Sequence, residues 1–129
     1  CDGILAFVTG SGLGPILSIL DKMTFNSDPR LKNFSICWGY RNIADGDILL
    51  ESLYPEVNFY RFCSRGDDPR AIGSYLTEFD FDGSYNPNSL YLACGNPKMV
   101  VEINEKLRTK GFEMAKFSSD NFLLRGDFP

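Results

Sequence analysis

Residues 4–15 read ILAFVTGSGLGP, and this stretch decides the class of fold. The first five positions are all apolar, which is typical of a strand covered on both faces of a parallel sheet. Three glycines then allow a tight turn, and Pro15 fits the first turn of a helix, where a missing N–H costs nothing. Apolar residues recur at helical spacing from Ile16 to Met23. The stretch therefore predicts a strand, a turn and a helix in succession.

The same alternation continues along the rest of the chain. Four further runs have the composition of strands: 34–38, 57–63, 90–94 and 112–117. Two segments have the pattern of helices: 47–54 and 96–110. The stretch 66–82 is ambiguous between a loop and a short helix. Strands that alternate with helices predict one α/β domain over residues 1–129, a five-stranded parallel sheet with helices on both faces and flavodoxin-like strand order.

Composition excludes several classes of function. The net charge is −4 and there is no polybasic run, so nucleic acid is not an expected partner. No run approaches the roughly 20 apolar residues of a membrane span. The four cysteines lie too far apart in the sequence for a metal site, and reduced cysteines favour the cytoplasm. Because the chain has no histidine, it holds neither a Ser-His-Asp triad nor a Cys–His nucleophile.

The loop after the first strand is the first candidate binding segment. In an open parallel sheet, ligands bind at the carboxyl ends of the strands, and N–H groups at a helix start favour an anion such as pyrophosphate. An ordinary glycine-rich turn stays open as the alternative. Pro15 replaces the third glycine of a GxGxxG motif, which disfavours a standard Rossmann dehydrogenase. The candidate residues are Thr9, Gly10, Ser11, Gly12, Leu13 and Gly14.

Two arginines follow the next two strands, at the same expected edge. Arg41 comes after the second strand, and Ser64 and Arg65 come after the third. Guanidinium and hydroxyl groups suit a phosphate monoester, such as the 2′-phosphate of a ribose. Two alternatives stay open: the arginines are merely solvated, or Asp67 and Asp68 pair with Arg65.

The motif CGNP at 94–97 follows the fourth strand. Gly95 gives room for a ligand, Asn96 is expected to cap the next helix, and Pro97 is expected at its first position. Cys94 is expected at the tip of the strand, facing the ligand cleft.

Together these motifs resemble a known family. Residues 8–15 with Ser18 resemble the TGTGIAP loop of ferredoxin–NADP reductases, and residues 94–99, CGNPKM, resemble their CGxPxM motif. Residues 39–42 and the helix from Asp47 resemble the segment after the second strand of these enzymes. The pair Ser64-Arg65 resembles the pair that binds the 2′-phosphate in NADP-specific members. The resemblance covers nearly the whole chain and implies the ferredoxin reductase-like NAD(P)-binding domain.

The resemblance also implies the roles of these residues. The loop 9–14 would hold the pyrophosphate, Arg41, Ser64 and Arg65 the adenosine end, and Cys94 would lie beside the nicotinamide. Gly95, Asn96, Pro97 and Met99 would complete the nicotinamide side of the site. The full-length enzyme would exchange a hydride between NADP(H) or NAD(H) and FAD, and pass electrons to ferredoxin, flavodoxin or an oxygenase component. FAD would be held mainly by a preceding β-barrel domain absent from this chain, so the isolated domain would be inactive. Phe128 is a weak candidate to approach the flavin, with packing as its favoured role.

Two alternative functions follow from positions where this chain departs from the pattern of the family. Bacterial NADP-linked members carry another arginine in a Gly-Arg step, whereas this chain has Gly73-Ser74, as the NADH-linked oxygenase reductases do; Arg70 is a possible substitute. NADPH is favoured, and an NADH-linked oxygenase reductase is the alternative. From another class, a flavodoxin-like module that binds FMN or serves signalling is conceivable on the same type of fold.

Overall fold

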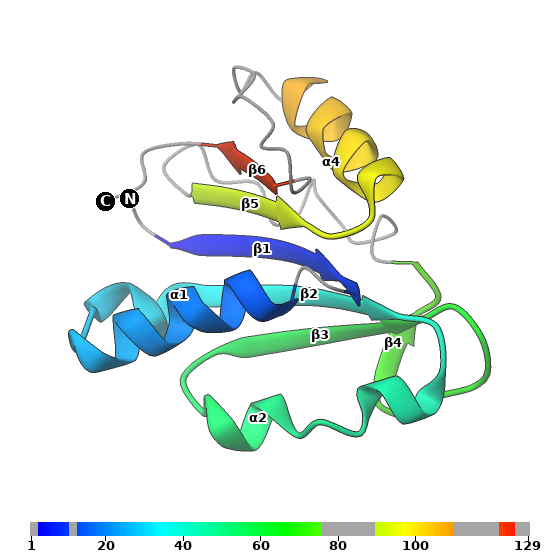
Figure 1. Ribbon diagram of the computed structural model, residues 1–129, viewed down its shortest axis with the longest axis horizontal. Coiled ribbons are helices and arrows are strands. Elements are labelled where there is room, and N and C mark those ends of the chain that lie inside the picture. The colour runs from blue at the N-terminus through cyan, green and yellow to red at the C-terminus, as the bar shows by residue number, and fades with distance from the viewer. Residues whose placement is uncertain (1–2, 11–12, 76–89, 110–121, 126–129) are drawn as a thin grey trace.

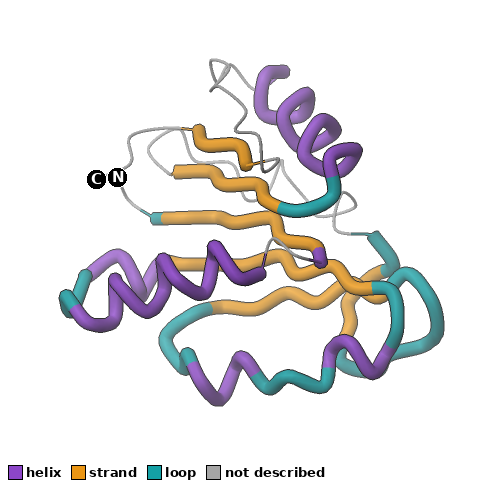
Figure 2. Tube along the Cα trace, in the orientation of Figure 1, coloured by secondary structure: helices purple, strands orange, loops and turns teal. Residues whose placement is uncertain are grey.

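A computed structural model describes residues 3–10, 13–75, 90–109 and 122–125. These residues form one six-stranded sheet in the order β4-β3-β2-β1-β5-β6 (Figures 1 and 2). Five neighbouring strands are parallel, and β6 runs antiparallel to β5. The strands are β1 (Ile4–Thr9), β2 (Phe34–Tyr40), β3 (Asn58–Cys63), β4 (Ala71–Gly73), β5 (Leu90–Cys94) and β6 (Phe122–Arg125).

Helices cover both faces of the sheet, as predicted. The α-helices are α1 (Leu13–Phe25), α2 (Leu50–Leu53) and α4 (Pro97–Thr109), and the 3-10 helices are η2 (Pro29–Asn33) and η3 (Ile43–Gly46). One core layer packs α1 and α2 against the sheet, and a second layer packs α4 against the opposite face. None of the helices in the described part of the chain is both long and apolar enough to span a bilayer.

The two layers explain the unbroken apolar run of β1. Ile4, Ala6 and Val8 belong to the layer under α1, whereas Leu5 and Phe7 belong to the layer under α4. Successive side chains of a strand point to opposite faces, so a strand covered on both faces has no position for a polar residue. β1 therefore lies at the centre of the sheet, between β2 and β5.

The prediction of flavodoxin-like strand order is wrong. A flavodoxin-like sheet has the order 2-1-3-4-5, but here β3 pairs with β2 and not with β1. The connection through η3 and α2 lies on the same face as α1, so each crossover adds its strand further outward on the same side. The chain then returns to place β5 on the other side of β1. The strand order therefore reverses between β1 and β5.

Two elements differ from the sequence prediction in extent. β4 lies in the stretch that was ambiguous, because three residues are too few to show a strand period. The helix predicted over 47–54 is shorter than expected and spans only α2, Leu50–Leu53. The carbonyl groups of Gly46 and Ile48, which precede it, accept hydrogen bonds from arginine side chains. The predicted strand 112–117 lies outside the described residues.

Candidate functional site

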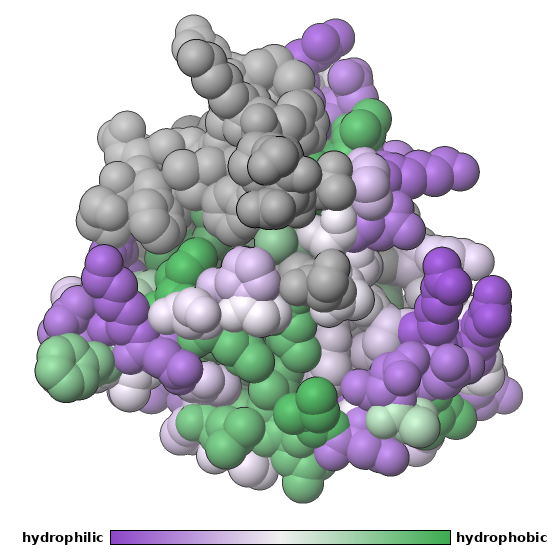
Figure 3. Space-filling view, in the orientation of Figure 1, coloured by the Kyte–Doolittle hydropathy of each residue, from purple (hydrophilic) through white to green (hydrophobic). Residues whose placement is uncertain are grey.

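The carboxyl ends of the parallel strands meet at one edge of the sheet, on the right of Figure 1. In Figure 3, which shares this orientation, hydrophilic side chains gather around that edge, whereas apolar side chains gather over α2. The loops after β1, β2, β3 and β5 all open there. The predicted site residues on these loops are therefore brought together by the topology of the sheet.

The loops after β1 and β5 are in direct contact at the point where the strand order reverses. Val8 pairs with Cys94, and the backbone N–H of Asn96 donates to Thr9 Oγ1 at 2.8 Å. Gly95 has φ +130°, and a Cβ at this position would overlap the carbonyl oxygen of Thr9. Only glycine allows this approach. The two motifs singled out from the sequence thus form one structural unit.

The two described glycines at the start of α1 are uncrowded. Gly10 has φ +49° and is exposed, and apart from chain neighbours and the backbone of α1, no atom of the described residues lies within 4 Å of where a Cβ would stand on Gly10 or on Gly14. Leu13 is half-buried and packs against the core. The first turn of α1 carries no acidic residue. Ser11 and Gly12 lie outside the described residues.

The start of α4 confirms the predicted cap. The Asn96 side-chain oxygen accepts the backbone N–H of Lys98 at 2.9 Å, and Pro97 is the first residue of the helix. Met99 is buried in the layer between α4 and the sheet, so its contribution here is packing. Cys94 ends β5, but its side chain is only 2% exposed and packs in the layer under α1. A direct contact between Cys94 and a ligand stays a prediction.

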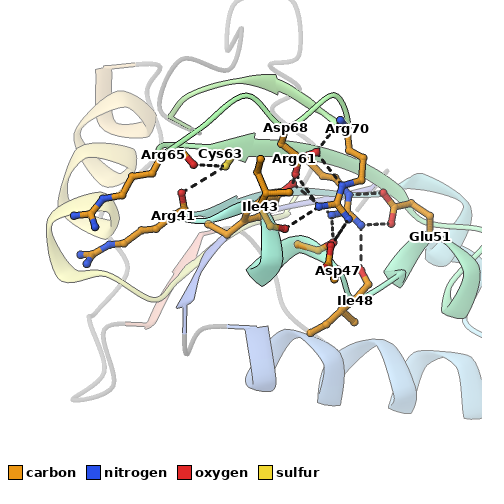
Figure 4. Close-up of polar contacts among 12 residues, drawn as sticks. Arg41, Ile43, Asp47, Ile48, Glu51, Arg61, Cys63, Arg65, Asp68 and Arg70 are labelled. Carbon is orange, nitrogen blue, oxygen red and sulfur yellow. Dashed lines mark hydrogen bonds and ion pairs between the residues drawn. The ribbon is translucent and has the colours of Figure 1, made fainter.

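The segments that carry the two predicted arginines run side by side. Beyond the last strand pair, Ser64 N–H donates to the Tyr40 carbonyl at 3.0 Å and Arg65 N–H donates to the Arg41 carbonyl at 2.8 Å. Ser64 is half-buried, whereas Arg41 and Arg65 are exposed. Figure 4 shows the two arginine side chains extending in the same direction. Neither guanidinium forms an ion pair with any residue that the structure describes.

The proposed pairing of Arg65 with Asp68 is not found. Asp68 is buried, and its carboxylate binds Arg70 Nε at 2.9 Å and the Tyr40 hydroxyl at 2.5 Å. The hydrogen bonds from Arg70 hold the pKa of Asp68 well below its usual range. Burial, together with the carboxylate of Asp68, raises the pKa of Tyr40. Asp67 is exposed and forms no ion pair within the described ranges. Arg65 therefore keeps its charge open to solvent.

A second pair of arginines, Arg61 and Arg70, lies close by; the sequence had suggested Arg70 only as a possible phosphate ligand and had not singled out Arg61. Arg61 is 2% exposed, lies 4.5 Å from the centre of the Trp38 ring and donates to the Gly46 carbonyl at 2.7 Å. Arg70 donates to the same carbonyl oxygen at 2.6 Å. An arginine in the middle of an apolar strand, FYRF at 59–62, is the signal that could have revealed the first of them.

Glu51, which is partly exposed, completes this arrangement. Arg61 donates to both of its carboxylate oxygens, at 2.7 and 2.8 Å. These hydrogen bonds lower the pKa of Glu51 and raise that of Arg61, so both groups stay charged at neutral pH. Arg70 also donates to the Ile43 carbonyl at 2.8 Å. The two arginines thus anchor the segment 43–51 to the sheet, and Figure 4 shows their side chains pointing away from Arg41 and Arg65.

A shallow hollow of about 360 Å³ lies beside the turn that carries Arg65. It is lined by Cys63, residues 66–69 and β4 with the following Ser74. Within the described ranges, no group of three or more Cys, Asp and Glu side chains is arranged to hold a metal ion. The exposed Arg41 and Arg65 give this edge two positive charges, which suit an anionic ligand.

Comparison with known proteins adds no assignment. No protein-family model matches the chain, and no curated protein matches its sequence. The functional argument accordingly depends on the geometry of the site.

Proposed function

We propose that this chain is the NAD(P)H-binding domain of a flavin-dependent electron-transfer oxidoreductase of the ferredoxin–NADP reductase type, with NADPH favoured. The observation that carries the proposal is the contact of Thr9 with Gly95 and Asn96 at the reversal of strand order. Ligands of open α/β sheets bind at this position. The two motifs that meet there are the two that resemble the family most specifically.

The pyrophosphate fits the loop 9–14. Gly10 and Gly14 leave the backbone open to a ligand, and α1 begins at the same place without an acidic first turn. The N–H groups at the start of a helix attract an anion because they lack partners within the helix and lie at the positive end of its dipole. The N-terminus of α4 is less open, since Asn96 already accepts the N–H of Lys98.

The adenosine end fits the edge between β2 and β3. Arg41 and Arg65 present two solvated positive charges from adjacent segments, and Ser64, with its hydroxyl group, directly precedes Arg65. A phosphate monoester accepts several charge-assisted hydrogen bonds from such a set.

The nicotinamide end fits the loop after β5, where Gly95 provides a close approach and Cys94 ends the strand. Hydride exchange between nicotinamide and FAD, with onward transfer of single electrons to ferredoxin, flavodoxin or an oxygenase component, is chemistry that the cofactors supply. FAD would be held mainly by a separate β-barrel domain. Three described cysteines are free, which favours a reducing compartment such as the cytoplasm.

The NADH-linked oxygenase reductase is the second candidate. Arg70 is engaged by Asp68 and by the carbonyls of Ile43 and Gly46, so it does not provide a third phosphate ligand. Two arginines are fewer than NADP-linked bacterial members carry. The FMN-binding alternative is weaker, because the strand order is not that of flavodoxin.

Calorimetric titration of this chain at low salt with 2′-phospho-AMP and with AMP tests the proposal. We expect tighter binding of 2′-phospho-AMP, because its additional phosphate meets Arg41 and Arg65. Equal binding of both nucleotides would favour the NADH-linked reductase. Absence of binding by either nucleotide would contradict the assignment as a nucleotide-binding domain.

A further inference from the structure

The thiol of Cys63 lies between the backbone carbonyl groups of the two exposed arginines, Arg41 and Arg65. Its Sγ is 3.5 Å from the Arg41 carbonyl oxygen and 3.4 Å from the Arg65 carbonyl oxygen (Figure 4). Cys63 is the last residue of β3 and is 4% exposed. One buried side chain therefore contacts the backbone of both arginine-bearing segments.

The position of this contact matters because the sheet ends there. Tyr40 and Cys63 form the last pair of the β2–β3 ladder, and in the described part of the chain the backbone hydrogen bond from Arg65 to Arg41 continues beyond it. Neighbouring strands of a sheet are twisted relative to each other, so segments that leave the ladder diverge unless other contacts hold them together. The thiol adds a contact where the two segments begin to separate.

The segments that follow the two arginines are held unequally. The segment from Ile43, which follows Arg41, is anchored by a hydrogen bond from Arg70. Gly66, which follows Arg65, is exposed and has φ +99°. A shift in the Arg65 carbonyl would therefore move the Arg65 side chain relative to Arg41.

We propose that Cys63 is a positioning residue, which sets the separation of the Arg41 and Arg65 guanidinium groups and thereby the preference for a 2′-phosphorylated nucleotide. This inference rests on the proposed function. A thiol is a weak donor with a single hydrogen, which can be shared between two carbonyl oxygens. The expected effect is therefore on selectivity and is modest in size.

A purely structural role for Cys63 makes a different prediction. If the side chain only fills space, its removal destabilises the fold and weakens all ligands alike. Cys37 provides a matched control: it is a buried cysteine on the neighbouring strand β2, and it belongs to the other core layer, under α4. Truncation of Cys37 removes the same atoms at a distance from the two arginine carbonyls.

The experiment compares Cys63→Ala, Cys63→Val and Cys63→Ser with Cys37→Ala and the unaltered chain. Calorimetry at low salt measures the affinity for 2′-phospho-AMP and for AMP, and urea unfolding measures stability.

We expect Cys63→Ala and Cys63→Val to weaken the binding of 2′-phospho-AMP by about three- to tenfold, the effect of one lost hydrogen bond. The affinity for AMP should stay within about twofold, because AMP lacks the 2′-phosphate whose hydrogen bonds depend on the two arginines. Cys63→Ser, which keeps a donor, should retain the preference for 2′-phospho-AMP over AMP. Cys37→Ala should lower stability without changing that preference. Cys63→Val fills the position with a somewhat larger apolar side chain that has no donor, and it provides the test if Cys63→Ala does not fold.

The outcomes separate the inference from the proposed function. If the unaltered chain prefers 2′-phospho-AMP and Cys63→Val keeps that preference, the role of Cys63 is overturned and the proposed function stands. A loss of affinity for both nucleotides in equal measure would also overturn it, in favour of packing alone. If the unaltered chain shows no preference, the NADP site and the role of Cys63 fail together.

Discussion

Two pairs of arginines lie at the same corner of the sheet and have opposite environments. Arg61 and Arg70 are engaged by carboxylates and carbonyl oxygens, and Arg61 is only 2% exposed. Arg41 and Arg65 are exposed and have no acidic partner among the described residues. Three residues of chain lie between the buried Arg61 and the exposed Arg65. The role of an arginine here depends on whether carboxylates and carbonyl oxygens lie within reach of its guanidinium.

The physical reason is the cost of removing a charge from water. A buried guanidinium is tolerated only when hydrogen bonds and an opposite charge replace its hydration. Arg61 meets this requirement through Glu51, two carbonyl groups and the face of Trp38. Arg41 and Arg65 keep their water and can exchange it for a phosphate. The first pair therefore stabilises the fold, whereas the second pair is available to a ligand.

The largest expected effect on stability comes from removing the buried Arg61. Arg61→Met keeps much of the apolar stem but leaves the Glu51 carboxylate and the Gly46 and Ile48 carbonyls without this donor. We expect the free energy of unfolding to fall by about 2–4 kcal/mol, because several hydrogen bonds from a charged group are lost together, while the half-exposed Glu51 regains water. Urea unfolding followed by the fluorescence of Trp38, the single tryptophan, measures this change.

The exposed pair supplies the control for that measurement. Arg41→Met should change the free energy of unfolding by no more than about 0.5 kcal/mol, as most surface substitutions do. If Arg61→Met costs no more than Arg41→Met, the buried arginine does not stabilise the fold in the way described.

The next effect tests the exposed pair as a phosphate site. Arg65→Ala should weaken 2′-phospho-AMP by about 1.5–3 kcal/mol, the contribution of a hydrogen bond to a charged group, and leave AMP nearly unchanged. Calorimetric titration with both nucleotides measures the difference. Arg108→Ala, which removes an exposed arginine of α4, controls for the change in net charge. An equal loss for both nucleotides would contradict a role in binding the 2′-phosphate.

The smallest effect concerns the carboxylate that pairs with Arg61. Glu51 is 46% exposed, so solvent screens the pair, and Glu51→Gln should cost about 0.5–1 kcal/mol at pH 7. Arg61 lowers the pKa of Glu51 in the folded state. The stabilisation is therefore complete above the unfolded-state pKa of about 4.3 and is lost as the pH falls through the folded-state value. Urea unfolding at pH 7 and at pH 3 should show the gap between variant and unaltered chain narrowing at the lower pH.

A matched substitution sharpens this comparison. Glu56→Gln removes an exposed carboxylate that forms no ion pair with the described residues. Its effect on stability should be smaller than that of Glu51→Gln at pH 7. If the difference in the free energy of unfolding between Glu51→Gln and the unaltered chain is the same at both pH values, stabilisation by the ionised Arg61–Glu51 pair is contradicted.

Much of the fold follows from local pattern. The strand β1, the helices α1 and α4 and the cap at Asn96 were all predictable, because an apolar period or a capping residue marks each of them. The strand β4 and the short helix α2 were not predicted correctly, because their extents depend on contacts with β3 and with two arginines. Strand order was also predicted wrongly, since hydrophobic pattern says which segments are strands but not which strands are neighbours.

The sequence by itself determined that this is an α/β domain, that loops rich in glycine and arginine follow its strands, and that the start of α4 is capped. Only the tertiary structure decided that Thr9 meets Gly95, that Asp68 binds Arg70 and leaves Arg65 open, and that Cys63 contacts both arginine-bearing segments. Backbone propensity and apolar spacing act over a few residues and are written in the local sequence. The partner of a charged or polar group is chosen by strand order and by which face of a strand it occupies, and these depend on the packing of the whole sheet.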